Sequence, residues 1–152
     1  MSRCSALLGL VLLLPASPLV AQTVTGVRDL NFGFVVRGVQ TTVPPSDPIR
    51  SGQFYVRYVI GGRVQLRFTL PTVLNRIGGG ATMPIGFRNN DGIARATSPA
   101  SVPVTFNPNA VTNFRLVTSP DFNVWLGGRV SPSAIQATGS YAGTIVLTCT
   151  FF

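Results

Sequence analysis

The stretch that decides the fold is FYVRYVIGGRVQLRFTLP, residues 54–71, in which two runs of alternating residues flank the pair Gly61-Gly62. Hydrophobic side chains occupy every second position of each run. A period of two is typical of a β-strand that turns one face towards an apolar core. The stretch therefore predicts two strands, with the inward positions Phe54, Val56, Tyr58 and Ile60 in the first and Val64, Leu66, Phe68 and Leu70 in the second.

The position of the two glycines predicts how these strands are connected. A two-residue hairpin at Gly61-Gly62 would place Ile60 opposite Arg63, and the apolar face of one strand would then coincide with the polar face of the next. The loop is therefore either three residues long or an arch that carries the chain from one sheet to a second. We prefer the arch, because it turns both apolar faces inward, as in a Greek-key sandwich.

The same alternation recurs along most of the chain, and no window shows the sustained 3.6-residue period of an amphipathic helix. Clusters of glycine, proline and asparagine separate the alternating segments, as turns separate short strands. We therefore predict an all-β protein with an immunoglobulin-like Greek-key β-sandwich. The further expected strands are residues 30–36, 82–88, 101–106, 113–117, 122–130 and 141–152.

The composition bounds the size and the chemistry of the protein. A length of 152 residues fits one domain, and 45% hydrophobic with 11% charged residues is typical of a folded chain. The sequence contains no histidine, lysine or glutamate; twelve arginines and four aspartates give a net charge of +8. Histidine acid–base catalysis, Cys/His metal sites and Schiff-base chemistry are thereby excluded. We expect a protein that is not an enzyme and that uses no cofactor or metal.

The first residues have the layout of a secretory signal peptide. Arg3 precedes a short apolar run, residues 6–14, and Ala21 offers a small residue for cleavage. The run is too short to span a bilayer. We therefore expect export to the periplasm and then to the cell surface, with no transmembrane segment in the mature chain. The expected organisation is a signal peptide over residues 1–21 and one domain over residues 22–152, beginning with a short extension, residues 22–29.

Cleavage would leave a single cysteine. Cys4 lies in the leader, so Cys149 would be alone in an oxidising compartment and an internal disulfide would be excluded. Two interpretations stay open. Cys149 is either a small buried hydrophobe or a thiol that forms an intermolecular bridge or reacts with other molecules.

The last twelve residues carry the most specific pattern. One face of the expected strand is apolar and ends in the penultimate aromatic residue, and Gly139 is fourteenth from the end. A last strand with nothing beside it is an exposed sheet edge. An ordinary final strand of a complete sandwich is the alternative. The apolar face consists of Tyr141, Gly143, Ile145, Leu147, Cys149 and Phe151.

This pattern resembles the carboxy-terminal motif of chaperone–usher pilus subunits. The region from about residue 29 to 152 also resembles the bacterial secreted proteins of the domain of unknown function 4402 family, which are related to spore coat protein U and the archaic pilins. The order and spacing of short motifs carry this resemblance. They are DLNFG (29–33), FYVRYVIGGRVQLRFTLP (54–71), LGG (126–128) and GSYAGT (139–144).

The resemblance implies an immunoglobulin-like sandwich that lacks one strand. In such families a periplasmic chaperone and then the amino-terminal extension of a neighbouring subunit complete the sandwich, and an outer-membrane usher exports the subunits. We therefore expect a pilin-like structural subunit of a filament, which assembles by donor-strand complementation. The expected partner groove consists of Gly139, Tyr141, Gly143, Ile145, Leu147, Cys149 and Phe151.

Two other functions are alternatives to a pilin-like subunit. One is a stand-alone extracellular domain that binds a glycan or another surface protein. The other is a small outer-membrane β-barrel, although a terminal strand with Phe152 outward would turn threonines rather than apolar residues to lipid. The arginine excess makes an anionic glycan a candidate partner, whereas export makes nucleic acid a poor one. Arg57 and Arg67, with Tyr55 nearby, offer one basic, aromatic surface, but an ordinary solvated face is the preferred interpretation of these residues.

The remaining polar motifs favour structural roles. Residues 89–92, NNDG, offer one carboxylate, so a turn is expected there rather than a calcium site. Asp29 and Asp121 have no supporting motif for acid–base chemistry. Trp125 is expected in the core rather than on a ligand platform.

Overall fold

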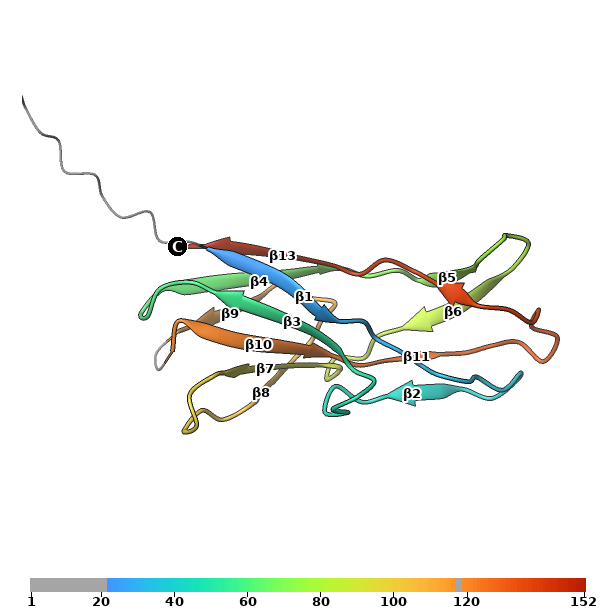
Figure 1. Cartoon of the computed structure of the whole chain (residues 1–152), viewed down its shortest axis with the longest axis horizontal. Helices are drawn as coiled ribbons and strands as arrows, with labels where there is room; N and C mark the ends of the chain where they lie inside the picture. Colours follow the sequence, from blue (N-terminus) through green and yellow to red (C-terminus); the bar gives the residue numbers. More distant parts are fainter. Residues whose placement is uncertain (1–21, 117–118) are drawn as a thin grey trace, which may run out of the picture.

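The structure is a computed structural model of the chain, and it describes residues 22–116 and 119–152. The expected signal peptide, residues 1–21, lies outside the described residues. The described residues form an elongated molecule of β-strands without helix (Figure 1). The strands are β1 (Thr23–Arg28), β2 (Thr41–Val43), β3 (Gly52–Arg57), β4 (Arg63–Thr69), β5 (Val73–Arg76), β6 (Thr82–Gly86), β7 (Gly92–Ala96), β8 (Val104–Phe106), β9 (Thr112–Arg115), β10 (Asp121–Leu126), β11 (Gly128–Val130), β12 (Tyr141–Ala142) and β13 (Val146–Phe151).

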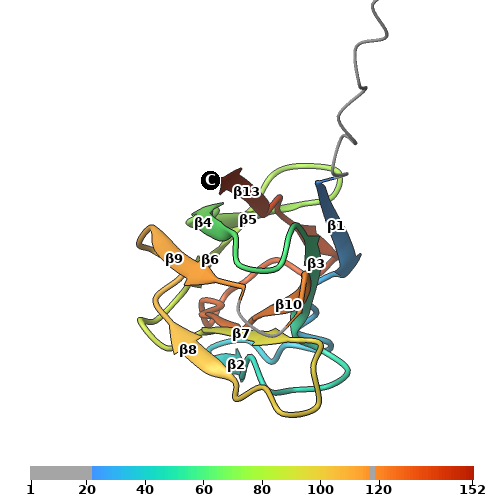
Figure 2. The ribbon, with the colours of Figure 1, turned by 90° about the vertical axis from the view of Figure 1, so that its left-hand side faces the viewer.

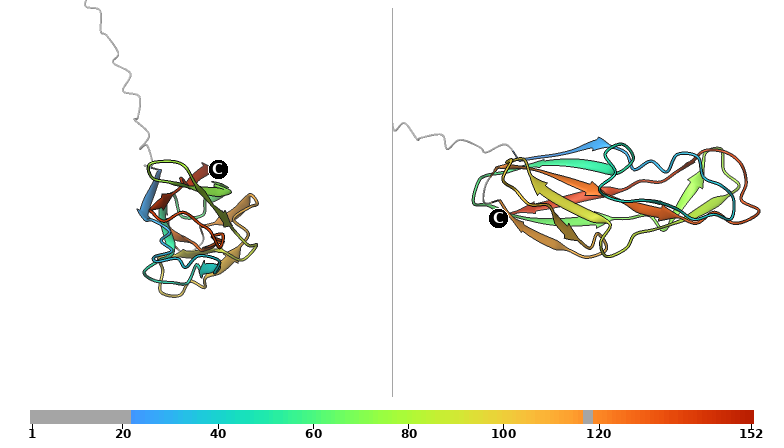
Figure 3. Two further views of the ribbon diagram at one scale, coloured as in Figure 1. Left: turned by 90° about the vertical axis from the view of Figure 1, so that its right-hand side faces the viewer. Right: turned by 90° about the horizontal axis from the view of Figure 1, so that it is seen from below.

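The strands form three antiparallel sheets. The first has the order β1-β3-β10-β7-β8 and the second β13-β4-β9, and the third has the order β12-β5-β6-β11-β2. The end view shows the first and second sheets as the two layers of a sandwich (Figure 2). The third sheet extends the molecule away from the end at which β1 begins and β13 ends (Figures 1 and 3). The predicted all-β, immunoglobulin-like sandwich is confirmed.

The arch between the first two predicted strands is also confirmed. β3 pairs with β1 and β10, whereas β4 pairs with β13 and β9, so the chain crosses between sheets at Gly61-Gly62. Gly61 has a φ of +85°, in the left-handed region that glycine adopts without strain. As expected from the register argument, Val56 and Val64 both face inward, and both are fully buried.

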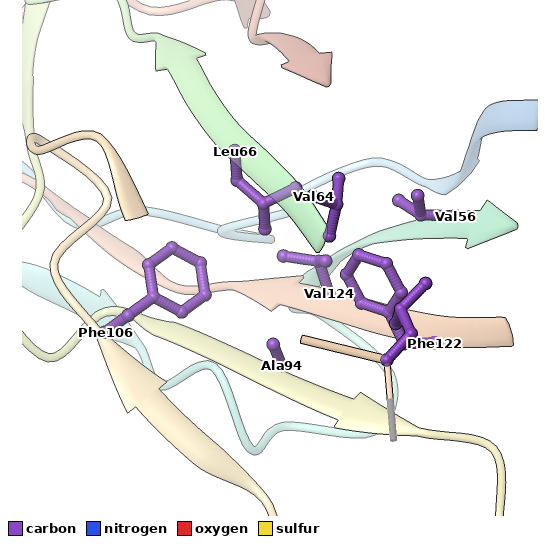
Figure 4. Packing of buried hydrophobic residues seen from close by; sticks show 8 residues of the cluster. Val56, Val64, Leu66, Ala94, Phe106, Phe122 and Val124 are labelled. Atoms are coloured by element: carbon purple, nitrogen blue, oxygen red, sulfur yellow. The ribbon is translucent and has the colours of Figure 1, made fainter. Parts of the chain in front are cut away.

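Two apolar clusters follow the long axis. The first lies between the two layers of the sandwich, where Val64 and Leu66 of β4 face Phe122 and Val124 of β10 (Figure 4). The second cluster lies under the third sheet and contains Phe32, Val43, Met83, Ile85 and Val130. Burial of these side chains is the main favourable contribution to folding.

The first segment of the chain differs from its prediction. Residues 22–29 were expected to precede the core, yet β1 pairs with β3 over most of its length. Residues 30–36 were expected to be the first strand, yet they contain none. The predicted alternation also fails after Phe32, which is buried, because Phe34 was expected on the same face and is fully exposed. What is missing is a partner strand, which local sequence does not encode.

Two long predicted strands are broken. The segment 122–130 divides at Gly127 into β10 and β11, which belong to different sheets. The segment 141–152 divides at residues 143–145 into β12, paired with β5, and β13, paired with β4. The breaks coincide across the sheet, because β4 and β5 are themselves separated at residues 70–72. No helix in the described part of the chain is long and apolar enough to cross a membrane.

The other predicted strands are found with shorter bounds. The expected segments 82–88, 101–106 and 113–117 correspond to β6, β8 and β9. β2, β5 and β7 were not anticipated. They lie in sequence whose alternation is interrupted by proline, glycine or arginine. β2 and β7 are held by pairing with the distant strands β11 and β10, and β5 pairs with its neighbour β6.

Candidate functional site

The strand order defines an open position in the sandwich. A seven-stranded immunoglobulin sandwich has strands A, B, E and D in one sheet and C, F and G in the other. In chain order β1, β3, β4, β7, β10 and β13 take positions A to F, with the expected neighbours. Within the described residues no strand occupies position G. The outer edge of β13 is therefore unpaired, and so is the outer edge of β1.

Side-chain exposure records the same opening. Inward side chains of β4, which is flanked by two strands, are buried, with Val64 at 0% and Leu66 at 1% exposure. Their direct partners on β13 are Phe151 and Cys149, which face the same apolar cluster but are only half-buried. The paired residues of β4 and β13 face the same cluster, so their facing direction does not explain the difference in exposure. The difference arises because β13 has a neighbouring strand on one side only, among the described residues.

A groove continues this opening along the third sheet. It is a cavity of about 1050 Å³ bounded on one side by residues 26–37 and on the other by residues 136–145. We call it the lateral groove. Its remaining lining is mostly apolar and comes from both clusters. These side chains are Phe54, Leu74, Met83, Ile85, Leu126 and Val130.

The seven predicted site residues divide into two groups. Gly139, Tyr141, Gly143 and Ile145 line the lateral groove. The other three, Leu147, Cys149 and Phe151, do not line it; they lie on β13 and pack against the first apolar cluster. All seven therefore follow one continuous edge, β12 to β13, of which the first part borders the cavity.

Tyr141 fixes the wall of the groove through its hydroxyl group. This hydroxyl donates to the Ala137 carbonyl at 2.7 Å and accepts a hydrogen bond from Gln136 Nε2 at 2.6 Å. Gln136 is itself buried and also donates to the Thr82 carbonyl at 3.0 Å. A buried amide with satisfied partners is rigid, so the loop before β12 is held against β6. Gln136 was not among the predicted site residues.

The two glycines of the motif allow close approach to β5. A Cβ at Gly143 would lie 2.8 Å from Leu74 Cδ2, and one at Gly139 would lie 2.8 Å from Arg76 Nε. Gly139 also has a φ of +139°. A side chain at either position would displace the neighbouring side chain of β5, and at Gly139 it would also strain the backbone.

The opposite wall was missed as a site by sequence reasoning. Leu30, Phe32, Phe34 and Val35 line the groove there. Backbone links to the rest of the molecule include Asn31 N–H, which donates to the Arg50 carbonyl at 2.8 Å. The alternating apolar residues were recognised, but they were assigned to a paired strand rather than to the rim of a groove.

Cys149 is a shielded thiol. Burial raises its pKa from 9.0 to about 11. The thiolate is the reactive form, so this environment makes the side chain a poor nucleophile at neutral pH. Of the two interpretations left open, the geometry favours the buried hydrophobe.

The remaining polar candidates do not form a catalytic group. Asp121 is opposite Arg57, at the end of β3. Asp29 comes directly after Arg28, which is opposite Gln53 near the start of β3. The two carboxylates therefore lie near opposite ends of the strand. The turn expected at residues 89–92 is found, and its Asp91 is buried and accepts the Arg88 N–H at 2.7 Å.

The expectation for Trp125 was wrong, and the less favoured interpretation of Arg57 and Arg67 is excluded. Trp125 alternates with buried Val124 and Leu126 on β10, so it lies half-exposed on the outer face rather than in the core. Arg57 and Arg67 do not share a surface, because β3 and β4 belong to opposite layers. Tyr55 accompanies Arg57, and the neighbouring Asp121 carboxylate raises the pKa of its phenol.

Comparison of the chain with protein-family models, with curated proteins and with solved structures gives no match.

Proposed function

We propose that this protein is a pilin-like structural subunit of a surface filament, which accepts a β-strand from another chain along the edge of β12 and β13. The observation that supports the proposal is the pair of unpaired edges, β1 and β13, at the open position of the sandwich, continued by the apolar lateral groove. An extended peptide can satisfy the backbone groups of such an edge and place alternate side chains in the groove.

The expected strength of the link is that of a durable polymer contact. Each apolar side chain that a donor strand buries contributes about 1.5–3 kcal/mol. Five such side chains give roughly 8–15 kcal/mol before the cost of ordering the donor is subtracted. No chemical reaction is needed to form this link.

The donor must be a segment other than residues 23–28, because β1 already pairs with β3 in its own sandwich. By the resemblance stated above, we propose a periplasmic chaperone as the first occupant and an extension of another subunit as the second. Export through the periplasm and an outer-membrane usher belongs to the same proposal.

The test compares two neighbouring positions of the acceptor edge. Ile145 lines the groove, whereas Val146 is the next residue and is exposed on the other face. We expect Ile145→Asp to reduce periplasmic accumulation and the heat- and SDS-resistant ladders of cell-surface extracts more than tenfold. Val146→Asp introduces the same charge and should leave both near the wild-type level.

Two results would count against the proposal. One is equal ladders from the Ile145→Asp and wild-type chains. The other is a purified protein that is monomeric without any partner and melts reversibly with Cys149 protected. That behaviour would favour a complete, stand-alone binding domain, since an incomplete sandwich should aggregate or require a partner strand.

A further inference from the structure

The outer face of the second sheet carries arginines without acidic partners. Because Val64 and Leu66 point inward, the alternating residues Arg63, Gln65 and Arg67 point outward. The neighbouring strand β9 adds Arg115 and Asn113 to the same side, opposite Arg63 and Gln65. We call these five residues the basic face.

Arg63 and Arg115 are directly opposite one another. Like charges at opposed positions of an antiparallel pair destabilise the sheet. Within the described residues neither these two arginines nor Arg67 forms an ion pair or a side-chain hydrogen bond. On the first sheet, by contrast, an arginine is opposite an acidic residue: Arg57 is opposite Asp121 and lies 3.6 Å from its carboxylate.

The spacing of the arginines selects an extended anion. Arg63 and Arg67 are four positions apart along β4, which corresponds to about 13 Å. A small anion can be held by Arg63 and Arg115 together, but it cannot also reach Arg67. A linear polymer with repeated negative groups can contact both positions.

The groups between the arginines are hydrogen-bonding ones. Gln65 Nε2 donates to Asn113 Oδ1 at 3.1 Å, which leaves amide groups of both residues free to bind a ligand. Thr148 and Thr150 of β13 are directly opposite Arg67 and Gln65 and are exposed. Single-stranded nucleic acids are bound by successive aromatic platforms, whereas amides and hydroxyls fit the hydroxyl groups of sugars.

We propose that the basic face binds a linear acidic polysaccharide, whose carboxylate or sulfate groups contact Arg63 with Arg115 and, further along the chain, Arg67. The face lies on the opposite side of its sheet from the apolar cluster. It therefore stays accessible when a strand occupies the groove, and the interaction is independent of filament assembly.

Binding to polygalacturonate tests the proposal, with its methyl ester as the neutral control of equal length. Protein expressed from the full sequence is used at about 0.15 M salt, where distant charges are screened. We expect polygalacturonate to bind and the ester not to. The pair Arg63→Gln with Arg115→Gln should weaken binding at least about tenfold, because a bidentate arginine–carboxylate contact is among the stronger polar interactions.

A charge-matched control separates this site from net charge. Arg57→Gln with Arg88→Gln removes the same two charges elsewhere and should change the affinity less than about twofold. Arg115→Gln alone should raise the melting temperature without ligand, because it relieves the repulsion with Arg63. Equal binding of the methyl ester, or equal loss in the control variant, would overturn the proposal, as would no binding of polygalacturonate.

Discussion

Val24 and Val56 are directly opposite one another in the β1–β3 pair, yet Val56 is fully buried and Val24 is 39% exposed. Both side chains face the interior of the sandwich. The difference arises because β3 has a strand on each side, whereas β1 has one only on the β3 side among the described residues. Val24 therefore faces the core but is left partly exposed at the edge of the sheet.

This relationship predicts unequal costs for the same substitution. Val56→Ala should lower the free energy of unfolding by roughly 2–3 kcal/mol, because it removes fully buried methyl groups and leaves a cavity. Val24→Ala should cost less than about 1 kcal/mol in the free protein. Urea unfolding of both variants measures the difference, and equal costs would mean that the edge beside β1 is already covered.

A second pair of matched substitutions tests the junction between the two halves of the molecule. A Cβ at Gly127 would lie 2.5 Å from the Val43 carbonyl oxygen and 2.6 Å from Pro45 N, both backbone atoms. Gly127→Ala should therefore destabilise the fold by about 2–3 kcal/mol, as overpacking does. A Cβ at Gly26 would meet no atom within 4 Å, and the φ of Gly26 is not positive.

The same change at Gly26 should act in the opposite direction. Gly26→Ala restricts the unfolded chain without strain in the folded one and should stabilise the protein by about 0.4–1 kcal/mol. Thermal melting of the two alanine variants gives the comparison. If Gly127→Ala melted no lower than Gly26→Ala, the close contact of the β10–β11 junction with β2 would be incorrect.

The outcome of the sequence predictions depends on whether a feature is local. The alternation around Gly61-Gly62 predicted the inward side chains within β3 and β4, but Ile60, also predicted inward, lies beyond the end of β3 and is 63% exposed. A hairpin could not turn Val56 and Val64 inward together, and this was enough to assign the two strands to different sheets. Residues 30–36 show the limit of this reasoning. Phe32 is buried, but Phe34 was expected on the same face and is exposed. A strand exists only where a neighbour provides hydrogen bonds, and without one the segment does not keep a regular alternation.

The same limit applies to the candidate site. The apolar face from Tyr141 to Phe151 could be read from the sequence because it is periodic. The break between β12 and β13 could not be read from the sequence, because it depends on the break between their partner strands β5 and β4. Leu30 and Phe32 across the groove could not be placed there either, because they are brought to it by the long-range pairing of β1 with β3.

Acid should weaken the turn before β3. Backbone N–H groups of Arg50 and Ile49 donate to the Asp47 carboxylate at 2.8 and 2.9 Å, and these bonds lower the pKa of Asp47 from 3.8. A lowered pKa in the folded state means that the stabilisation is present above about pH 4 and is lost as the pH falls through the folded-state value. Asp47→Asn should reduce the melting temperature at pH 7 and remove part of its fall below pH 4.

The control for this prediction is a carboxylate in a different setting. Asp29→Asn removes an exposed carboxylate outside that turn, so the part of the acid dependence caused by the Asp47 hydrogen bonds should remain. Melting curves of the two variants are measured between pH 2 and pH 7. This range includes 3.8, the ordinary pKa of an aspartate side chain. Identical acid dependence of the wild-type and Asp47→Asn proteins would refute a role for these hydrogen bonds.

Alkylation of Cys149 should report both its burial and the occupation of the open edge. A thiol with a pKa of about 11 is roughly a hundredfold less ionised at pH 8 than one at 9.0, so the folded protein should react about a hundredfold more slowly than the protein unfolded in guanidinium. Because the pKa is raised on folding, the associated stability is present below about pH 9 and is lost as the pH rises towards 11.

Strand acceptance adds a second, separable effect. Cys149 is half-buried because no strand covers its flank, so a bound donor strand should slow alkylation further at every pH. The comparison uses free protein and protein taken from the SDS-resistant ladders, labelled at pH 8 and pH 9.5. A rate that is lower in the ladders, with the same increase with pH, is expected for an edge closed by a strand. Equal rates would place the link between subunits somewhere other than β13.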